Sequence, residues 1–144
     1  MILVINTADQ KQVFIGLANK GKLVAKKEFQ AQYKQAEKLL VEIDKLLSIN
    51  NCLPRFAGEA GQLTTIKGVA VVNGPGPFTA LRIGVVTANI LAWALKIPVT
   101  GIKLTEFRNI DELIKLIFRK IKKAKVGTII EPFYGKEPNI TKKK

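Results

Sequence analysis

The stretch from Val69 to Leu95 constrains the fold of this chain more than any other part of its sequence. An apolar run, Val69 to Val72, ends at the turn sequence Asn73-Gly74-Pro75-Gly76, and a long apolar segment follows. A short apolar run bounded by turn residues is typical of a buried strand. Glycine permits positive φ angles and proline fixes its own φ. The sequence therefore predicts a buried strand, a tight turn and a helix over Phe78–Leu95.

The predicted helix has almost no polar face, since only Thr87 and Asn89 interrupt its apolar residues between Ile83 and Leu95. A helix that packs on one side only would carry a polar stripe on the other. Small residues recur at every fourth position and predict a strip that another helix could approach closely: Ala80, Gly84, Ala88 and Ala92. The pattern leaves two interpretations open, an ordinary core helix and a helix that binds a partner.

If the helix binds a partner, the predicted interface combines the small strip with larger neighbours and two residues of an earlier helix. These residues are Tyr33, Leu40, Ala80, Leu81, Gly84, Val85, Ala88, Leu91 and Ala92. A membrane span is not expected, because a span needs about 20 apolar residues. Arg82 and Lys96 bracket a shorter run.

The remaining elements follow from periodicity. Apolar runs and alternation predict strands at Ile2–Ile5, Gln12–Ala18, Leu23–Phe29 and Pro98–Ile102, and helical spacing predicts an amphipathic helix over Ala31–Ile49. Short turns join the first three strands, and right-handed crossovers should place the last two strands parallel to the first. The order βββαβαβ predicts an α/β fold, a mixed sheet with flanking helices, as in the ribonuclease H-like half of the sugar-kinase, heat-shock-protein and actin superfamily.

Composition limits the chemistry and suggests a class of partner. The chain has 144 residues, 24 basic and 11 acidic side chains, no histidine and one cysteine, Cys52. The absence of histidine excludes Ser-His, Cys-His and two-histidine zinc sites, so we predict no catalytic residues, no metal and no cofactor. A net charge of +13 favours polyanionic partners such as RNA. A single cysteine and a polar N-terminus without a signal pattern predict a cytoplasmic protein.

Residues Gly74 to Gly84, Gly-Pro-Gly-Pro-Phe-Thr-Ala-Leu-Arg-Ile-Gly, resemble the signature of the TsaB (YeaZ) family, Gly-Pro-Gly-Ser-Phe-Thr-Gly-Leu-Arg-Ile-Gly. The opening residues Ile2 to Thr7 and the segment Ile97 to Ile102 resemble the same family. The resemblance covers residues 1 to about 105. It implies a non-catalytic subunit of the machinery that makes threonylcarbamoyl-adenosine at position 37 of tRNA.

In that family the subunit pairs with a catalytic paralogue, TsaD, through a helix bundle, and a TsaE-type ATPase joins the complex. The resemblance therefore implies a TsaD-type partner bound by Ala31–Ile49 and Phe78–Leu95, with tRNA as a further partner. Without the partner, we expect the exposed helices to pair in a homodimer. No membrane is expected as a partner.

One departure from the family bears on an alternative function, a small ATP-binding or ATP-dependent enzyme. Such a site would use Asn6, Thr7, Gly74 and Gly76. Asn6 stands where the family has an aspartate, and an amide lacks the charge that helps to hold a phosphate-bound metal ion. The turn also lacks the lysine of a phosphate-binding loop. These differences favour the interaction subunit.

The residues after Ile102 are few for a second lobe, so we predict a lobe at 1–105 and a reduced C-terminal segment at 106–144, with one helix and a basic tail. Asn109 and Glu112 predict a capping box for a helix ending near Ile121, and Val126–Ile130 is a candidate strand. Four basic residues are candidates for tRNA contact: Arg119, Lys120, Lys122 and Lys123. A solvated helix face explains the same charges equally well.

Overall fold

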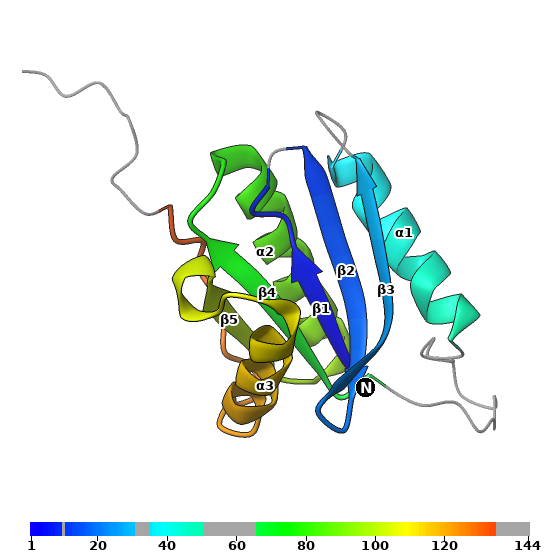
Figure 1. The fold of residues 1–144 in the computed structure, drawn as a ribbon, viewed down its shortest axis with the longest axis vertical. Helices are drawn as coiled ribbons and strands as arrows, with labels where there is room; N and C mark the ends of the chain where they lie inside the picture. Colours follow the sequence, from blue (N-terminus) through cyan, green and yellow to red (C-terminus); the bar gives the residue numbers. More distant parts are fainter. Residues whose placement is uncertain (10, 31–34, 51–65, 135–144) are drawn as a thin grey trace, which may run out of the picture.

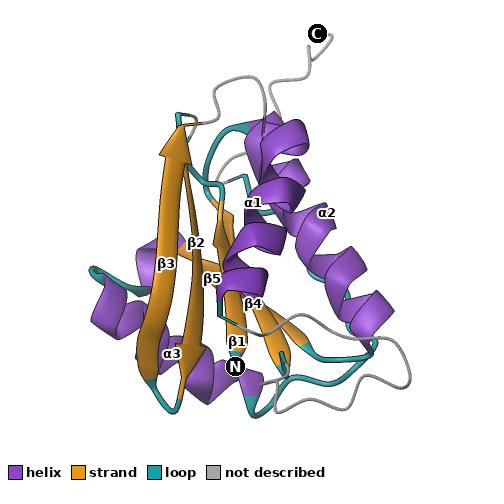
Figure 2. Cartoon of the chain, turned by 90° about the vertical axis from the view of Figure 1, so that its right-hand side faces the viewer, coloured by secondary structure: helices purple, strands orange, loops and turns teal. Residues whose placement is uncertain are grey.

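The computed structural model describes residues 1–9, 11–30, 35–50 and 66–134. In this part of the chain, a five-stranded sheet of order β3-β2-β1-β4-β5 carries helices on both faces (Figures 1 and 2). The strands are β1 (Ile2–Asn6), β2 (Gln12–Asn19), β3 (Lys22–Gln30), β4 (Gly68–Gly74) and β5 (Val99–Lys103). The helices are α1 (Gln35–Ile49), α2 (Phe78–Leu95) and α3 (Ile110–Ile121), with a short 3-10 turn η1 (Leu104–Glu106).

The sheet is mixed because of how its strands are connected. Short connections make β1–β2 and β2–β3 antiparallel, whereas the longer connections that carry α1 and α2 make β1–β4 and β4–β5 parallel. The predicted order βββαβαβ and the ribonuclease H-like α/β architecture are therefore confirmed. Residues 31–34 of the first predicted helix lie outside the described residues.

Two apolar layers hold the sheet between the helices. The paired central strands β1 and β4 are buried over Ile2–Ile5 and Val69–Val72, as expected for parallel strands that are covered on both faces. Leu3, Ile5, Val69 and Val71 pack with α1 and α2 on one face, and Val4, Ala70 and Val72 pack with α3 on the other. Figure 2 shows α1 and α2 on one side of the sheet and α3 on the opposite side.

The strip of small residues on α2 faces the sheet of this chain. Ala80, Gly84, Ala88 and Ala92 are all buried, and a Cβ atom on Gly84 would lie 2.2 Å from the Thr7 Oγ1 atom. The strip does admit a close neighbour, but that neighbour is the end of β1 and not a partner helix. This is a correction to the expected role of the strip.

The opposite side of α2 is apolar as well, which makes the helix long and apolar enough to cross a membrane by length and composition alone. In the structure one side of the helix belongs to the core, since its small residues are buried on the sheet, whereas the other side is exposed.

Helix α3, which follows the predicted boundary at residue 105, packs on the sheet. Leu113, Ile114 and Ile117 of α3 belong to the same buried cluster as Val4 and Val72 of the sheet. The helix expected to be a remnant of a second lobe therefore covers the second face of this lobe, because the sheet is apolar on both faces. The remainder of the predicted C-terminal segment, 135–144, lies outside the described residues.

The ends of α3 are as predicted, but the strand expected after it is absent from the described residues. The Asn109 side chain accepts a hydrogen bond from the Glu112 backbone N–H at 2.9 Å, which caps the helix. Residues Val126–Ile130 form no strand. Gly127 has φ +98° and Val126 and Ile129 are exposed, so the alternation of buried residues that a strand needs is missing.

We predict that Gly84→Ala destabilises the fold by about 1–3 kcal/mol, as overpacking does in well-packed cores. Alanine ordinarily favours a helix by about 1 kcal/mol over glycine. Here the added methyl group would overlap the Thr7 side chain. Urea unfolding monitored by circular dichroism measures the change.

A second substitution provides the control. Thr7→Ala removes the atoms nearest to the new methyl group, so Thr7→Ala should cost less in the Gly84→Ala background than in the original chain. Strictly additive losses in this double-mutant cycle would contradict the proposed clash.

Candidate functional site

The turn between β4 and α2 is covered by residues 129–134, which we call the C-terminal strap. The Phe133 backbone N–H donates to the Asn73 carbonyl oxygen at 2.6 Å, and Asn73 Nδ2 donates to the Glu131 carbonyl oxygen at 2.9 Å. Gly74 has φ +133°, and a Cβ atom there would lie 1.7 Å from the Phe133 carbonyl oxygen. Only glycine fits at this position, because both the backbone conformation and the approach of the strap exclude a side chain.

The strap also binds α2, and this contact explains one of the polar interruptions in the apolar helix. Asn89 Nδ2 donates to the Ile130 carbonyl oxygen at 2.8 Å, and Asn89 Oδ1 accepts from the Ile130 N–H at 2.9 Å. The rings of Phe78 and Tyr134 lie 4.2 Å apart between centroids. Asn89 is therefore a structural residue that fixes the strap along the helix.

The residues predicted for nucleotide binding lie close together, but they already contact other residues of this chain. Asn6 is the last residue of β1 and Thr7 follows it, beside the turn after β4. Thr7 is fully buried and its hydroxyl donates to the Ala80 carbonyl oxygen at 2.7 Å, while Asn6 Oδ1 accepts from the Ala8 N–H at 2.9 Å. A Cβ atom on Gly76 would lie 2.6 Å from the Ala8 carbonyl oxygen. The turn is thus packed against the backbone of its own chain.

Among the described residues, no group of three or more Cys, Asp or Glu side chains is placed to hold a metal ion. The arrangement at the end of β1 and β4 is one of backbone contacts and single hydrogen bonds between neighbouring elements.

The exposed side of α2 carries large apolar residues instead. Trp93 is 80% exposed, Ile90 58% and Val86 51%, and Phe78 lies two turns before Val86 on the same side. We call Phe78, Val86, Ile90 and Trp93 the outer face of α2. Val86, Ile90 and Trp93 are spaced by four and three residues, and Phe78 lies eight residues before Val86, which places all four on one side of the helix. Arg82, which is exposed in the same row, is the signal in the sequence that could have identified this side.

The predicted interface residues differ in their solvent exposure. Leu40 is exposed on α1, Leu91 is half-buried, and Tyr33 lies outside the described residues. The other six are buried within the chain: Ala80, Leu81, Gly84, Val85, Ala88 and Ala92. Most of the predicted interface residues of α2 therefore lie on the side that the sheet covers, whereas Val86 lies on the exposed side.

The predicted tRNA-contacting residues divide into one paired and three unpaired cations. Lys120 Nζ lies 2.9 Å and 3.0 Å from the two carboxylate oxygens of Glu106, whereas Arg119, Lys122 and Lys123 are exposed without an ion pair in the described part of the chain. The Lys103 backbone N–H also donates to Glu106, at 2.8 Å. This hydrogen bond, together with Lys120, holds the pKa of Glu106 below its ordinary value of 4.5.

Comparison with known proteins identifies a family model and several proteins that this chain resembles. The family model described as TsaD, tRNA N6-adenosine threonylcarbamoyltransferase, matches residues 30–107, more than half of the chain. The tRNA threonylcarbamoyladenosine biosynthesis protein TsaB of Bacillus subtilis is 42% identical over 58 residues, which are 37% of this chain and 25% of that protein. A tRNA N6-adenosine threonylcarbamoyltransferase of Geotalea daltonii is 46% identical over 44 residues, 31% of this chain and 13% of that protein.

Solved structures agree with the sequence comparisons. YeaZ from Pseudomonas aeruginosa superposes with a TM-score of 0.56 at 26% identity, over 71% of this chain and 43% of that one. The chain thus matches less than half the length of each of these relatives. Fold and matched segments together define a class, the ribonuclease H-like proteins related to tRNA threonylcarbamoyltransferase. The chain belongs to this family, on its TsaB (YeaZ) branch.

We predict that Glu106→Gln lowers the free energy of unfolding at pH 7 by up to about 1 kcal/mol, since the pair with Lys120 is partly exposed and screened by solvent. The folded pKa of Glu106 lies below 4.5, so its carboxylate stabilises the fold above that pH, and this contribution is lost as the pH falls through the folded pKa. The difference from the original chain should therefore shrink as the pH approaches 2. Urea unfolding across this pH range measures it, with the exposed Glu28→Gln as control; a difference that grows on acidification would contradict the assignment.

Proposed function

We propose that this chain is a non-catalytic, cytoplasmic subunit in the biosynthesis of threonylcarbamoyladenosine in tRNA, and that it pairs with a TsaD-type protein through the outer face of α2. The family supports the process, since the matched relatives carry the names of TsaB and of tRNA threonylcarbamoyltransferases. The observation that carries the proposal is Trp93, an indole that is 80% exposed beside two further exposed apolar residues, Ile90 and Val86.

Exposed apolar groups of this size are uncommon on proteins that act alone. Contiguous apolar patches mark interaction sites, and tryptophan is enriched among the residues that contribute most to binding. On α2 the apolar side chains follow the helix axis, so a second helix could bury several of them at once. Leu40 and Val41 of α1 are also about half exposed and extend the apolar surface on this side of the sheet.

The role of a protein-binding subunit agrees with the contacts at the predicted nucleotide site, whose residues are bound to other parts of the same chain. Thr7 is bonded to α2, and the turn after β4 lies against Ala8 and Phe133. A phosphate at this turn would have to displace the C-terminal strap. In our proposal a TsaE-type ATPase supplies nucleotide chemistry to the complex, and the outer face of α2 pairs with a second copy of the chain when the TsaD-type protein is absent.

We predict that Trp93→Ala weakens binding to the TsaD-type protein of the same organism by tenfold or more, since tryptophan is enriched among the residues that contribute about 2 kcal/mol or more to interfaces. Val86→Glu should act in the same direction by placing a charge in an apolar interface. Both side chains are exposed, so the fold should be unaffected. Co-purification followed by size-exclusion chromatography with light scattering measures the complex.

A matched control uses the same substitution elsewhere. Val24 on β3 is 49% exposed, close to the 51% of Val86, so Val24→Glu adds an equal charge away from α2 and should leave the complex intact. Equal binding by all three variants would contradict the proposed face. Substitutions at Leu81 or Ala88 cannot serve here, because both residues are fully buried and their replacement would disrupt the core.

The alternative function, an ATP-binding module, is addressed by calorimetry with ATP and ADP at about millimolar concentration. Saturable binding by the isolated chain that Thr7→Ala abolishes would support the alternative and overturn the non-catalytic assignment. A stable complex with the TsaD-type protein and no nucleotide heat from the isolated chain support the proposal.

A further inference from the structure

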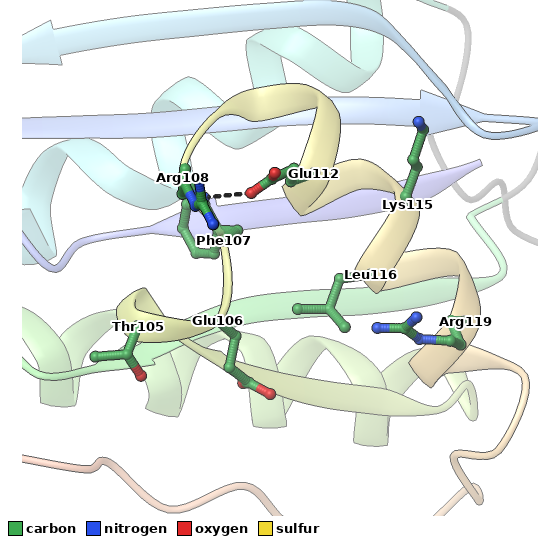
Figure 3. Close-up of a pocket in the computed structure, with 8 residues that line it drawn as sticks. All are labelled: Thr105, Glu106, Phe107, Arg108, Glu112, Lys115, Leu116 and Arg119. Carbon is green, nitrogen blue, oxygen red and sulfur yellow. Dashed lines mark hydrogen bonds between the residues drawn. The ribbon is translucent and has the colours of Figure 1, made fainter.

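A hollow of about 410 Å³ lies between η1 and α3, on the face of the sheet opposite to α1 and α2 (Figure 3). Figure 3 shows Arg108 beside Glu112 at one end of the hollow and Arg119 toward the other. Its volume is in the range of sites that hold small ligands or parts of larger ones. The lining residues are Thr105, Glu106, Phe107, Arg108, Glu112, Lys115, Leu116 and Arg119.

Both carboxylates in this lining are already bound to donors of the chain itself. Glu106 accepts from Lys120 Nζ and from the Lys103 N–H, at 2.8–3.0 Å. Glu112 Oε1 accepts from the Arg108 backbone N–H at 2.8 Å, as part of the cap of α3. These contacts are made by backbone groups and by Lys120. They leave the charged ends of the other basic side chains without a partner.

Three basic side chains at the hollow have no partner for their charged ends among the described residues. Arg108, Lys115 and Arg119 are all exposed, and the described residues provide no ion pair or side-chain hydrogen bond for any of them. Lys115 and Arg119 are four residues apart on α3, so they lie one turn apart on the same side, about 6 Å along the axis. Like charges at this spacing repel each other, and a bound anion would relieve that repulsion.

The positive surface continues past the end of α3. Lys120, Lys123 and Lys125 line a second hollow, of about 620 Å³, beside β5 and the C-terminal strap, with Glu131 as its acidic residue. Lys120 lies between the two hollows, since it bonds Glu106 of the first and lines the second. The cations therefore line two hollows that share Lys120 as a neighbour, which suits several phosphates better than a single small anion.

We propose that Arg108, Lys115 and Arg119 bind backbone phosphates of RNA, and that Lys123 and Lys125 extend the contact to neighbouring phosphates. Arginine suits this role because its guanidinium group can donate two hydrogen bonds to one phosphate. The choice of RNA over other polyanions rests on the proposed function, in which a tRNA is modified. The phosphate contacts would hold an RNA on the α3 face while the α1 and α2 face remains free for a protein.

The test compares the intact chain with Arg108→Gln/Lys115→Gln/Arg119→Gln for binding to a fluorescently labelled, unmodified tRNA transcript. Fluorescence anisotropy is measured over a series of salt concentrations upward from about 50 mM. The intact chain should bind with a dissociation constant that rises steeply with salt, because each neutralised phosphate releases counterions. The triple variant should bind at least about tenfold more weakly at low salt, and its log–log salt slope should be smaller by about two to three, since each of the three lost phosphate contacts contributes about 0.7–0.9.

The matched control removes three cations from the opposite face of the sheet: Lys38→Gln/Lys45→Gln/Lys96→Gln. It has the same net charge as the first variant and should change the affinity by less than about threefold. Equal losses in both variants would overturn the proposal and indicate attraction by net charge alone. No detectable binding by the intact chain at low salt would overturn it as well, as would binding to vesicles of anionic lipid that is lost in the first variant while tRNA binding is not.

The test of RNA binding is independent of the test of pairing with the TsaD-type protein. RNA binding is measured on the isolated chain, whereas pairing with the TsaD-type protein is measured on Trp93→Ala and Val86→Glu. RNA binding that depends on the hollow, without any such pairing, would leave the phosphate site standing and remove the proposed partner. Pairing without RNA binding would do the reverse.

Discussion

The contact between the end of β1 and the buried side of α2 is the constraint on which the rest of this structure depends. The Thr7 hydroxyl donates to the Ala80 carbonyl oxygen, and the missing side chain of Gly84 makes room for Thr7 one turn further along the helix. Because β1 pairs with β4 and β4 leads through the turn into α2, this contact closes a loop of connected elements. It fixes the rotation of α2 about its own axis.

That rotation determines which residues of α2 are exposed to solvent and available to a partner. With the small residues turned toward the sheet, the large ones at Val86, Ile90 and Trp93 are turned outward. A helix rotated by half a turn would bury the indole and expose alanines. The proposed protein surface therefore follows from the close approach of Thr7 to Gly84 on the buried side of α2, and the cations at the two hollows lie on the other face of the same sheet.

Much of this fold could be predicted from the sequence, because periodicity and turn residues report directly on local structure. Continuous apolar runs identified β1 and β4, alternation identified β2, and the Asn109 cap identified the start of α3. Apart from Arg82, the pattern of α2 does not indicate which side of the helix binds the sheet, since its other residues are mostly apolar and small residues suit either neighbour. The same limit applies to the charges on α3. Sequence showed that Lys120 and Arg119 are basic, but only the structure shows that Glu106 pairs with Lys120 and leaves Arg119 free.

The position of the C-terminal strap in the chain affects the order in which the elements of the fold form. Its partners Asn73 and Asn89 lie 58 and 41 residues earlier in the chain than Glu131 and Ile130. During synthesis the strap leaves the ribosome after β4, α2 and α3, and its docking surface exists only once the turn and α2 are in place. Contacts between residues so distant in sequence form slowly, because a long loop must close first. The strap therefore docks late, onto a turn and a helix that are already in place.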